Sequence, residues 1–194
     1  MKQAATRELY NYWNDLRRQR AAPNRIELDP AAIRGVLSNT FMIEVDPGRS
    51  YPLRIVGSRM TALFRRELNT EAFMGLWVRE DRHLVTQIIQ TVLDGPVPAV
   101  AGITAAPPAR APIELELLLL PLRHEGKTHS RMLGSLVPAS IPSWYGIIGV
   151  DALQVETSRF IYDRMPADSP PHVVGSVAAT ARRRAHLVVL DGGR

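Results

Sequence analysis

The stretch Y-P-L-R-I-V-G-S-R-M-T-A-L-F-R-R-E-L-N-T-E-A-F-M-G-L-W, residues 51–77, contains the signals that decide the fold. Leu53 and Ile55 alternate with neighbours of a different character, which is the period-two pattern of a strand with two unlike faces. Gly57 gives the backbone freedom to leave that strand, and Ser58 is placed to cap a helix behind it. The stretch therefore predicts a strand, a glycine corner and one or two short helices.

The predicted helix behind the corner carries an apolar stripe. Met60, Leu63 and Phe64 recur at spacings of three and four residues, which places them on one side of a helix. A sheet edge and a short helix that face each other across a turn enclose space of the kind that small-molecule sites use. We therefore expect a binding pocket in this stretch.

The stretch also resembles a known family. The pattern F/Y-x-x-R-x-x-G-(S/T)-R, followed by L-F-x-R-E-L and F-x-x-L-W, is similar to the central part of the bacterial stand-alone PAS-domain family, PAS_5. The chain departs from that pattern at Arg65 and Thr70, where the family commonly has glycine. Three other segments resemble the same family: L-Y-x-Y-W-x-x-L-R-x-x-R-x-A-P-x-R at 9–25, E-L-E-L-L-L-L-P-L at 114–122 and R-M-L-G-S-L-V-P at 131–138.

The resemblance implies an α+β, PAS-like fold, with a five-stranded antiparallel sheet, short helices on one face and an N-terminal helix on the other. The chain has 194 residues, which suits one domain with extensions. We divide it into an N-terminal amphipathic helix and arm (1–28), the PAS domain (29–140) and a C-terminal extension (141–194). The extension is rich in Pro, Ala and Ser over 163–181, where we expect flexibility, and its apolar end suits a surface groove or a partner.

Periodicity elsewhere in the chain predicts elements in an order that fits this fold. Apolar residues at helical spacing predict helices over 5–20 and 81–94, and Asp29-Pro30 predicts the start of a short helix that ends at Leu37. Runs of strand-forming residues predict strands over 41–45, 97–104, 113–120 and 131–137, the first of them forming a hairpin with the strand at Leu53, and one more strand within 144–150.

The predicted strand 113–120 has two different faces along its length. Its odd-numbered residues are all apolar, whereas its even-numbered side changes from Glu114 and Glu116 to leucine. A sheet covered on one face only would stay polar on the other. The second face is therefore partly covered, either by the N-terminal helix with Trp13 or by a second subunit.

The sequence does not indicate an enzyme. It has no cysteine, which excludes disulfides, thiolate catalysis and cysteine-ligated metals. Its five histidines lack the spacing of a helix-borne metal site, and no P-loop, dinucleotide glycine fingerprint, H-E-x-x-H or G-x-S-x-G occurs. Glu114 and Glu116 share a strand face, but we interpret them as solvated side chains because no partner base is apparent. We expect no catalytic and no metal-binding residues.

The net charge of +5 favours an anionic partner only weakly. The 24 basic residues are nearly all arginines scattered along the chain, with clusters at 17–20 and 182–184 that lack interleaved aromatics, so nucleic acid is not the favoured partner. The longest uncharged apolar run, 117–122, is too short to span a bilayer, and charged residues throughout the first 20 argue against a signal peptide. We expect a cytoplasmic protein without a transmembrane segment.

The candidate site residues come from the pocket stretch and the first helix. Arg54 has two interpretations, an ion pair with Glu67 or Asp46 and a contact with an anionic ligand, and the ion pair is favoured. The large aromatics are core side chains more often than cofactor stacks. The ligand-binding candidates are Arg54, Met60, Phe64, Phe73 and Trp77, and the partner-binding candidates are Leu9, Trp13 and Leu16.

The resemblance implies a non-catalytic sensory or signalling protein that binds a small molecule, a protein partner, or both, as a homodimer or with another signalling protein. It does not fix the ligand or the cofactor, because one fold serves many functions. The alternative is a basic adaptor that binds nucleic acid or an anionic surface through the two arginine clusters. A small hydrolase or isomerase would need a buried acid or histidine, which the sequence does not indicate.

Overall fold

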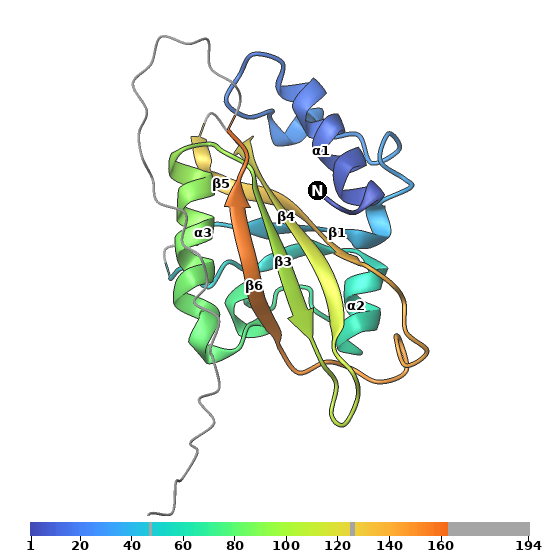
Figure 1. Cartoon of the computed structure of the whole chain (residues 1–194). Helices are drawn as coiled ribbons and strands as arrows, with labels where there is room; N and C mark the ends of the chain where they lie inside the picture. Colours follow the sequence, from blue (N-terminus) through green and yellow to red (C-terminus); the bar gives the residue numbers. More distant parts are fainter. Residues whose placement is uncertain (47, 125–126, 163–194) are drawn as a thin grey trace, which may run out of the picture.

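A six-stranded antiparallel sheet forms the centre of the protein (Figure 1). The computed structural model describes residues 1–46, 48–124 and 127–162. The strand order is β2-β1-β5-β4-β3-β6, and each of these neighbouring strands pairs antiparallel. The strands are β1 Thr40–Glu44, β2 Leu53–Val56, β3 Ala99–Ala105, β4 Ile113–His124, β5 Lys127–Pro138 and β6 Leu153–Phe160.

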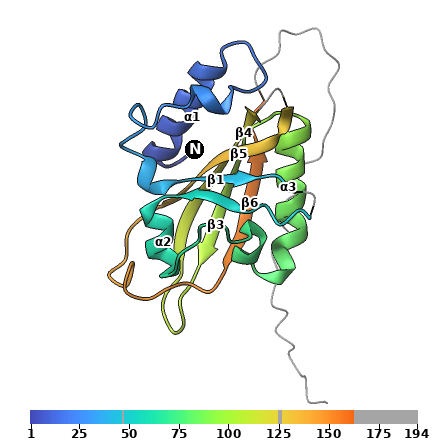
Figure 2. The ribbon, with the colours of Figure 1, turned by 180° about the vertical axis from the view of Figure 1, so that it is seen from behind.

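Helices cover both faces of this sheet, and Figure 2 shows them from behind. Helix α1 (Ala4–Arg17) lies on one face, and α2 (Ser58–Phe64) and α3 (Arg82–Asp94) lie on the other. Four short 3₁₀ turns connect them, at Arg25–Glu27, Leu37–Asn39, Phe73–Leu76 and Arg79–Asp81. The predicted α+β arrangement is confirmed, with an antiparallel sheet and with the N-terminal helix on the face opposite the short helices.

Two apolar cores follow from the alternation along β4. Leu117 and Leu119 belong to the core under α2 and α3, whereas Leu118, Leu120 and Leu122 belong to the core under α1. The chain's own helix α1 therefore covers the second face of the sheet. The sequence had left two possibilities for this cover, the N-terminal helix and a second subunit. All five leucines are almost fully buried.

One aromatic ring of the core under α2 and α3 lies directly on the sheet backbone. Phe41 of β1 pairs with Gly134 of β5, and a Cβ at position 134 would overlap the Phe41 ring. The ring therefore occupies the space that any side chain at 134 would need. Gly134 is thus required for close packing between an aromatic ring and a neighbouring strand.

The corner after β2 forms for a different reason from the one predicted. Gly57 has an ordinary φ of −69°, so it does not use glycine's access to left-handed backbone. A Cβ there would instead overlap the carbonyls of Leu37 and Ser38, so the glycine permits a close backbone approach. The prediction that Ser58 caps α2 was wrong, because Gly57 is the N-cap and no side chain bonds to the free N–H groups.

The two positions where the family commonly has glycine have left-handed backbone in this chain. Arg65 ends α2 with φ 55°, and Thr70 has φ 69°. The backbone N–H of Thr70 donates to the carbonyl of Leu53 at 2.8 Å, which ties this loop to β2. A β-branched residue is strained at positive φ, so Thr70 holds a conformation that glycine would adopt more easily.

Two predicted elements differ from the structure. Residues 30–36 form successive turns in place of a helix, although Asp29 accepts a hydrogen bond from the N–H of Ala31 at 2.9 Å as a cap would. The segment 144–150 forms turns, and the additional strand is β6, which pairs with β3 and makes the sheet six-stranded in place of five. The expectations for 163–181, for 182–184 and for the apolar end of the chain lie outside the described residues.

Helix α1 is held at its N-terminus by a side chain of the sheet. The carboxylate of Glu116 accepts hydrogen bonds from the backbone N–H groups of Lys2 at 2.6 Å and Gln3 at 3.0 Å. Burial alone would raise the pKa of Glu116, but these donors outweigh it and hold the pKa below its ordinary value. At the other end of the helix, the indole Nε1 of Trp13 donates to the carbonyl of Pro121 at 2.9 Å.

We expect Glu116→Gln to lower the free energy of unfolding by about 1–2 kcal/mol, because a charge-assisted pair of hydrogen bonds is lost. The contribution of Glu116 is complete above the unfolded carboxyl pKa of 4.5 and is lost as the pH falls through the lower folded value. Urea unfolding between pH 7 and pH 3 measures this, and the gap between wild type and variant should close toward pH 3. An equal gap at both pH values would contradict the assignment.

We expect Thr70→Gly to stabilise the protein by about 0.5–1 kcal/mol, because relief of left-handed strain exceeds the extra chain entropy of glycine. Thr70→Ala is the matched control: it removes the same side-chain atoms except Cβ and keeps the strain, so its stability should rise less. Thermal unfolding of the three proteins tests the order. A melting temperature of Thr70→Gly at or below that of Thr70→Ala would show that the relief of strain does not exceed the entropy cost of glycine.

Candidate functional site

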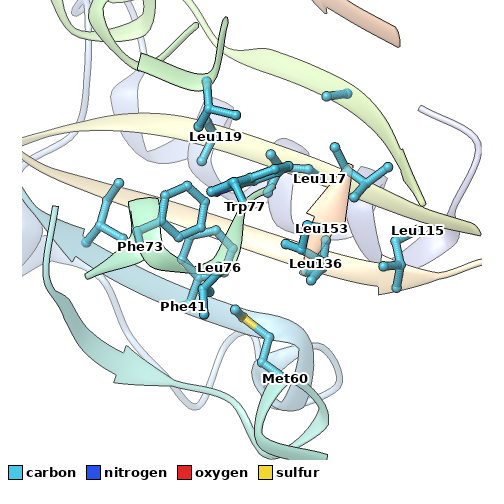
Figure 3. Packing of buried hydrophobic residues seen from close by; sticks show 14 of the residues in the cluster. Phe41, Met60, Phe73, Leu76, Trp77, Leu115, Leu117, Leu119, Leu136 and Leu153 are labelled. Carbon is cyan, nitrogen blue, oxygen red and sulfur yellow. The ribbon is translucent and has the colours of Figure 1, made fainter. Parts of the chain in front are cut away.

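Four of the five predicted ligand-binding residues lie in the core between the sheet and the α2–α3 layer. Met60, Phe64, Phe73 and Trp77 are all at least 97% buried there. Phe73 stacks on Phe41 with ring centroids 5.3 Å apart and meets Trp77 edge to face at 5.6 Å. Figure 3 shows these rings beside leucines of β4 and β5. We call this set of side chains the aromatic chamber.

The segment that carries Trp77 is fixed by the last strand. The N–H of Val78 donates to the carbonyl of Leu153 at 3.1 Å, and the carboxylate of Asp81 accepts from the N–H of Val155 at 2.8 Å. The Arg82 side chain donates to the carbonyl of Trp77 at 3.2 Å. Strand β6 therefore fixes the backbone segment that follows Trp77.

Trp77 has one feature that packing does not explain. Its indole N–H is buried and has no hydrogen-bond partner. Buried donors are nearly always paired, because an unpaired one loses its bond to water without compensation. The Trp77 ring packs among apolar side chains that include Phe73, Leu76 and Leu153. The chamber therefore offers an unpaired donor among apolar side chains.

Arg54, the fifth predicted ligand-binding residue, lies outside the chamber. Met42 pairs with Ile55 and Ile43 pairs with Leu53, so Arg54 is the extra residue of a β-bulge. Its side chain is 43% exposed and forms an ion pair with Glu44 at 2.7 Å, instead of with Glu67 or Asp46 as the sequence suggested. The structure does not bring Arg54 together with the other four.

A segment that sequence reasoning did not assign to the site covers α2. The Tyr145 hydroxyl donates to the carbonyl of Arg59 at 2.7 Å, and the N–H of Val150 donates to the carbonyl of Leu63 at 3.0 Å. Burial raises the pKa of Tyr145 to about 12, although the charge of Arg59 opposes the rise. Only the apolar character of residues 144–150 signalled this role in the sequence.

The predicted partner-binding residues pack within the chain. Leu9 and Trp13 are buried in the core between α1 and the sheet, and Leu16 is half-buried. A partner would meet Leu9 and Trp13 only if α1 left the sheet. The partner-binding role of these three residues remains a prediction, and in the described arrangement their side chains serve the fold.

A cavity of about 550 Å³ lies on the α1 face of the sheet, outside the aromatic chamber. Three carboxylates line it, Glu114, Glu116 and Glu156, together with the cations Lys2 and Arg159. Glu116 bonds the start of α1, and Glu156 accepts from the hydroxyl of Thr104 at 2.7 Å. Within the described residues, no group of three or more acidic or histidine side chains is arranged to hold a metal ion.

The N-terminal arginine cluster is largely engaged in internal contacts. The Arg17 guanidinium lies 5.2 Å from the centre of the Trp13 ring. Arg20 forms two hydrogen bonds with the Glu27 carboxylate at 2.8 and 2.9 Å and another with the carbonyl of Leu16. This arrangement does not favour the adaptor alternative, whose second cluster, 182–184, lies outside the described residues.

We expect Arg54→Ala to change the free energy of unfolding by less than about 1 kcal/mol, because exposed ion pairs contribute little. Chemical denaturation measures this change, and a large loss would show that the bulge depends on the ion pair between Arg54 and Glu44.

We expect Phe73→Ala to lower the free energy of unfolding by about 3–5 kcal/mol, because it empties a buried aromatic position. Chemical denaturation measures this loss as well.

Two solved LOV structures are similar to part of this chain. Among solved structures, the LOV protein of Rhodobacter sphaeroides is similar over 54% of this chain and 61% of its own, with 11% identity and a TM-score of 0.43. A point variant of the same LOV protein gives 15% identity and a TM-score of 0.41 over 54% and 62%. The chain thus spans about three-fifths of these LOV chains. No curated protein matches it.

No helix within the described residues is long and apolar enough to cross a bilayer.

The sequence of the chain matches a protein family over most of its length. The family model PAS_5, described as a PAS domain, matches residues 1–137, which include the aromatic chamber and both apolar cores up to β5. The resemblance found in the sequence is confirmed, and the chain belongs to the PAS_5 family of PAS domains.

Proposed function

We propose that this protein is a non-catalytic sensory PAS protein that binds a small, uncharged ligand in the aromatic chamber. The unpaired indole N–H of Trp77 carries the proposal, because a ligand with a hydrogen-bond acceptor would satisfy it. The chamber side chains Met60, Phe64, Phe73 and Trp77 carry no charge, and Arg54 lies outside the chamber. An anionic ligand would be buried there without a counter-ion, at a high free-energy cost.

Entry of a ligand requires the chamber to repack, since its side chains fill it. Met60 is suited to this, because its unbranched side chain adapts to irregular space, and it lies next to the aromatic rings (Figure 3). Phe73 contacts both Trp77 and the sheet residue Phe41. A ligand that moved Phe73 would therefore act on β1 and its neighbours, which gives binding a route to the protein surface.

We propose that the output is a change in association, with a second copy of the chain or with another signalling protein. A sensory protein without an enzymatic output passes its signal on through contacts with other molecules. The apolar surface beside β1 and β2 supports this, since Ile26 and Ile55 are exposed there. Large exposed apolar side chains that gather at one place mark interaction surfaces.

Trp77→Phe tests the ligand proposal, since it keeps an aromatic ring and removes the N–H. Native mass spectrometry of the full chain and thermal shifts with a panel of uncharged aromatic ketones report binding. We expect the affinity of any bound compound to fall about tenfold in Trp77→Phe, which corresponds to one neutral hydrogen bond.

Trp144→Phe is the matched control, because Trp144 belongs to the same core and is not among the unpaired buried donors. Its ligand affinity should stay at the wild-type value. The proposal fails if no compound binds, or if Trp77→Phe binds every compound as tightly as wild type.

A further inference from the structure

One segment of chain contacts the aromatic chamber at two places. Residues 139–152, which we call the strap, connect β5 to β6 and run past α2 (Figure 1). At α2 the Tyr145 hydroxyl and the N–H of Val150 donate to carbonyls of the helix. The strap then leads into Leu153 of β6, which forms a backbone bridge with Trp77. The strap therefore spans the side of the chamber between α2 and Trp77.

Two side chains anchor the strap in the core, while the residues between them reach solvent. Trp144 and Val150 are buried in the same cluster as the chamber side chains. Ile147 lies between them and is 71% exposed. The strap is therefore a cover one chain thick over this side of the core.

The strap is held less firmly than the other walls of the chamber. The strands of the sheet pair with their neighbours along their length, and α3 buries five side chains over its 13 residues. Residues 139–152, all of them described, form turns and bends with neither helix nor strand, and two hydrogen bonds join them to α2. Segments with few hydrogen bonds and little regular structure open at a lower free energy than sheets and helices.

Two glycines give the strap its path. Gly146 has a φ of +76°, which favours glycine, and a Cβ there would lie 3.9 Å from the Cβ of Ala62, at ordinary contact distance. Gly149 lies against the end of α2, where a Cβ would come within 2.6 Å of the carbonyl oxygen of Phe64. Gly149 therefore lets the strap close onto α2, and Gly146 provides a point where the backbone can rotate.

We infer that the strap is the gate of the aromatic chamber, and that a ligand reaches Trp77 when the strap leaves α2. The inference rests on the ligand site proposed above and names its entrance. Loops that close over binding sites pivot about a few residues and open in microseconds to milliseconds. Opening exposes Met60 and Phe64 first, because they belong to the helix that the strap leaves.

A disulfide between Ala62→Cys and Gly146→Cys locks this gate. The two Cβ positions lie 3.9 Å apart, which is within the range that disulfides span, and the chain has no other cysteine. The reduced form of the same double variant is the matched control. It carries both substitutions, including any strain at position 146, and leaves the strap free to open.

Hydrogen exchange of the Trp77 indole N–H, followed by nuclear magnetic resonance, reports opening without a ligand. This buried N–H exchanges only when water reaches it. We expect the exchange to be at least tenfold slower in the oxidised double variant than in the reduced one. The Trp13 indole, which donates to Pro121 in the core under α1, should exchange at the same rate in both forms.

Two outcomes of this exchange experiment overturn the inference. An unchanged Trp77 rate after oxidation would show that water enters by another route. Equal slowing of Trp77 and Trp13 would show that both indoles exchange through unfolding of the whole domain.

Tyr145→Phe tests the gate in the opposite direction. It keeps the ring and removes the hydroxyl that bonds the carbonyl of Arg59, so the exchange of Trp77 should be about fivefold faster, the factor for one neutral hydrogen bond. Tyr162→Phe is the control, because Tyr162 is 60% exposed and lies outside the strap, and its exchange rate should equal that of wild type. Equal rates for the two variants would contradict the gate.

Binding of the aromatic ketones separates the gate from the ligand proposal. The oxidised protein should bind and release a compound at least tenfold more slowly than the reduced protein, with nearly the same dissociation constant. A compound that binds both forms at the same rate overturns the gate and leaves the ligand site intact. If no compound binds, the ligand proposal fails, and the indole exchange alone decides whether the strap opens the chamber.

Discussion

The structure depends on the burial of both faces of β4. Three leucines of this strand, Leu118, Leu120 and Leu122, face α1, and their burial contributes roughly 5–9 kcal/mol. That amount is comparable to the whole stability of a typical domain, about 5–15 kcal/mol. Helix α1 is therefore a structural layer of the PAS domain, although it ends at Arg17, well before the pocket stretch begins at Tyr51. The carboxylate of Glu116 fixes where this layer begins.

Much of the architecture is readable from apolar periodicity. The alternation along residues 113–120 predicted two covered faces, and the spacing in 51–77 predicted the strand, the corner and the helix. Met60, Phe73 and Trp77 were predicted to lie together because they follow one another in that stretch, and large aromatics find the core of a domain. The sequence therefore predicted which large apolar side chains of this stretch are buried. It was wrong about Glu116, which we expected to be solvated and which is only 8% exposed.

Apolar periodicity does not reveal features that depend on the register between strands. Arg54 falls outside the chamber because it alternates with the buried Leu53 along β2. The bulge opposite Met42 and Ile43 then leaves Ile55 exposed as well, and no residue type signals that bulge. Strand β6 escaped prediction because it is a sheet edge with mostly polar residues, so its burial pattern is weak. Gly57 was identified as essential, but for a backbone approach of Leu37 and Ser38 that only the folded chain reveals.

The contact between Phe41 and Gly134 has a mechanical consequence. The ring rests on bare backbone of the neighbouring strand, with no side chain between them to absorb a displacement. Phe41 in turn stacks on Phe73. A displacement of Phe73 would therefore move the Phe41 ring against the backbone of β5. It would strain the hydrogen bonds between β1 and β5 directly, because no intervening side chain can move aside.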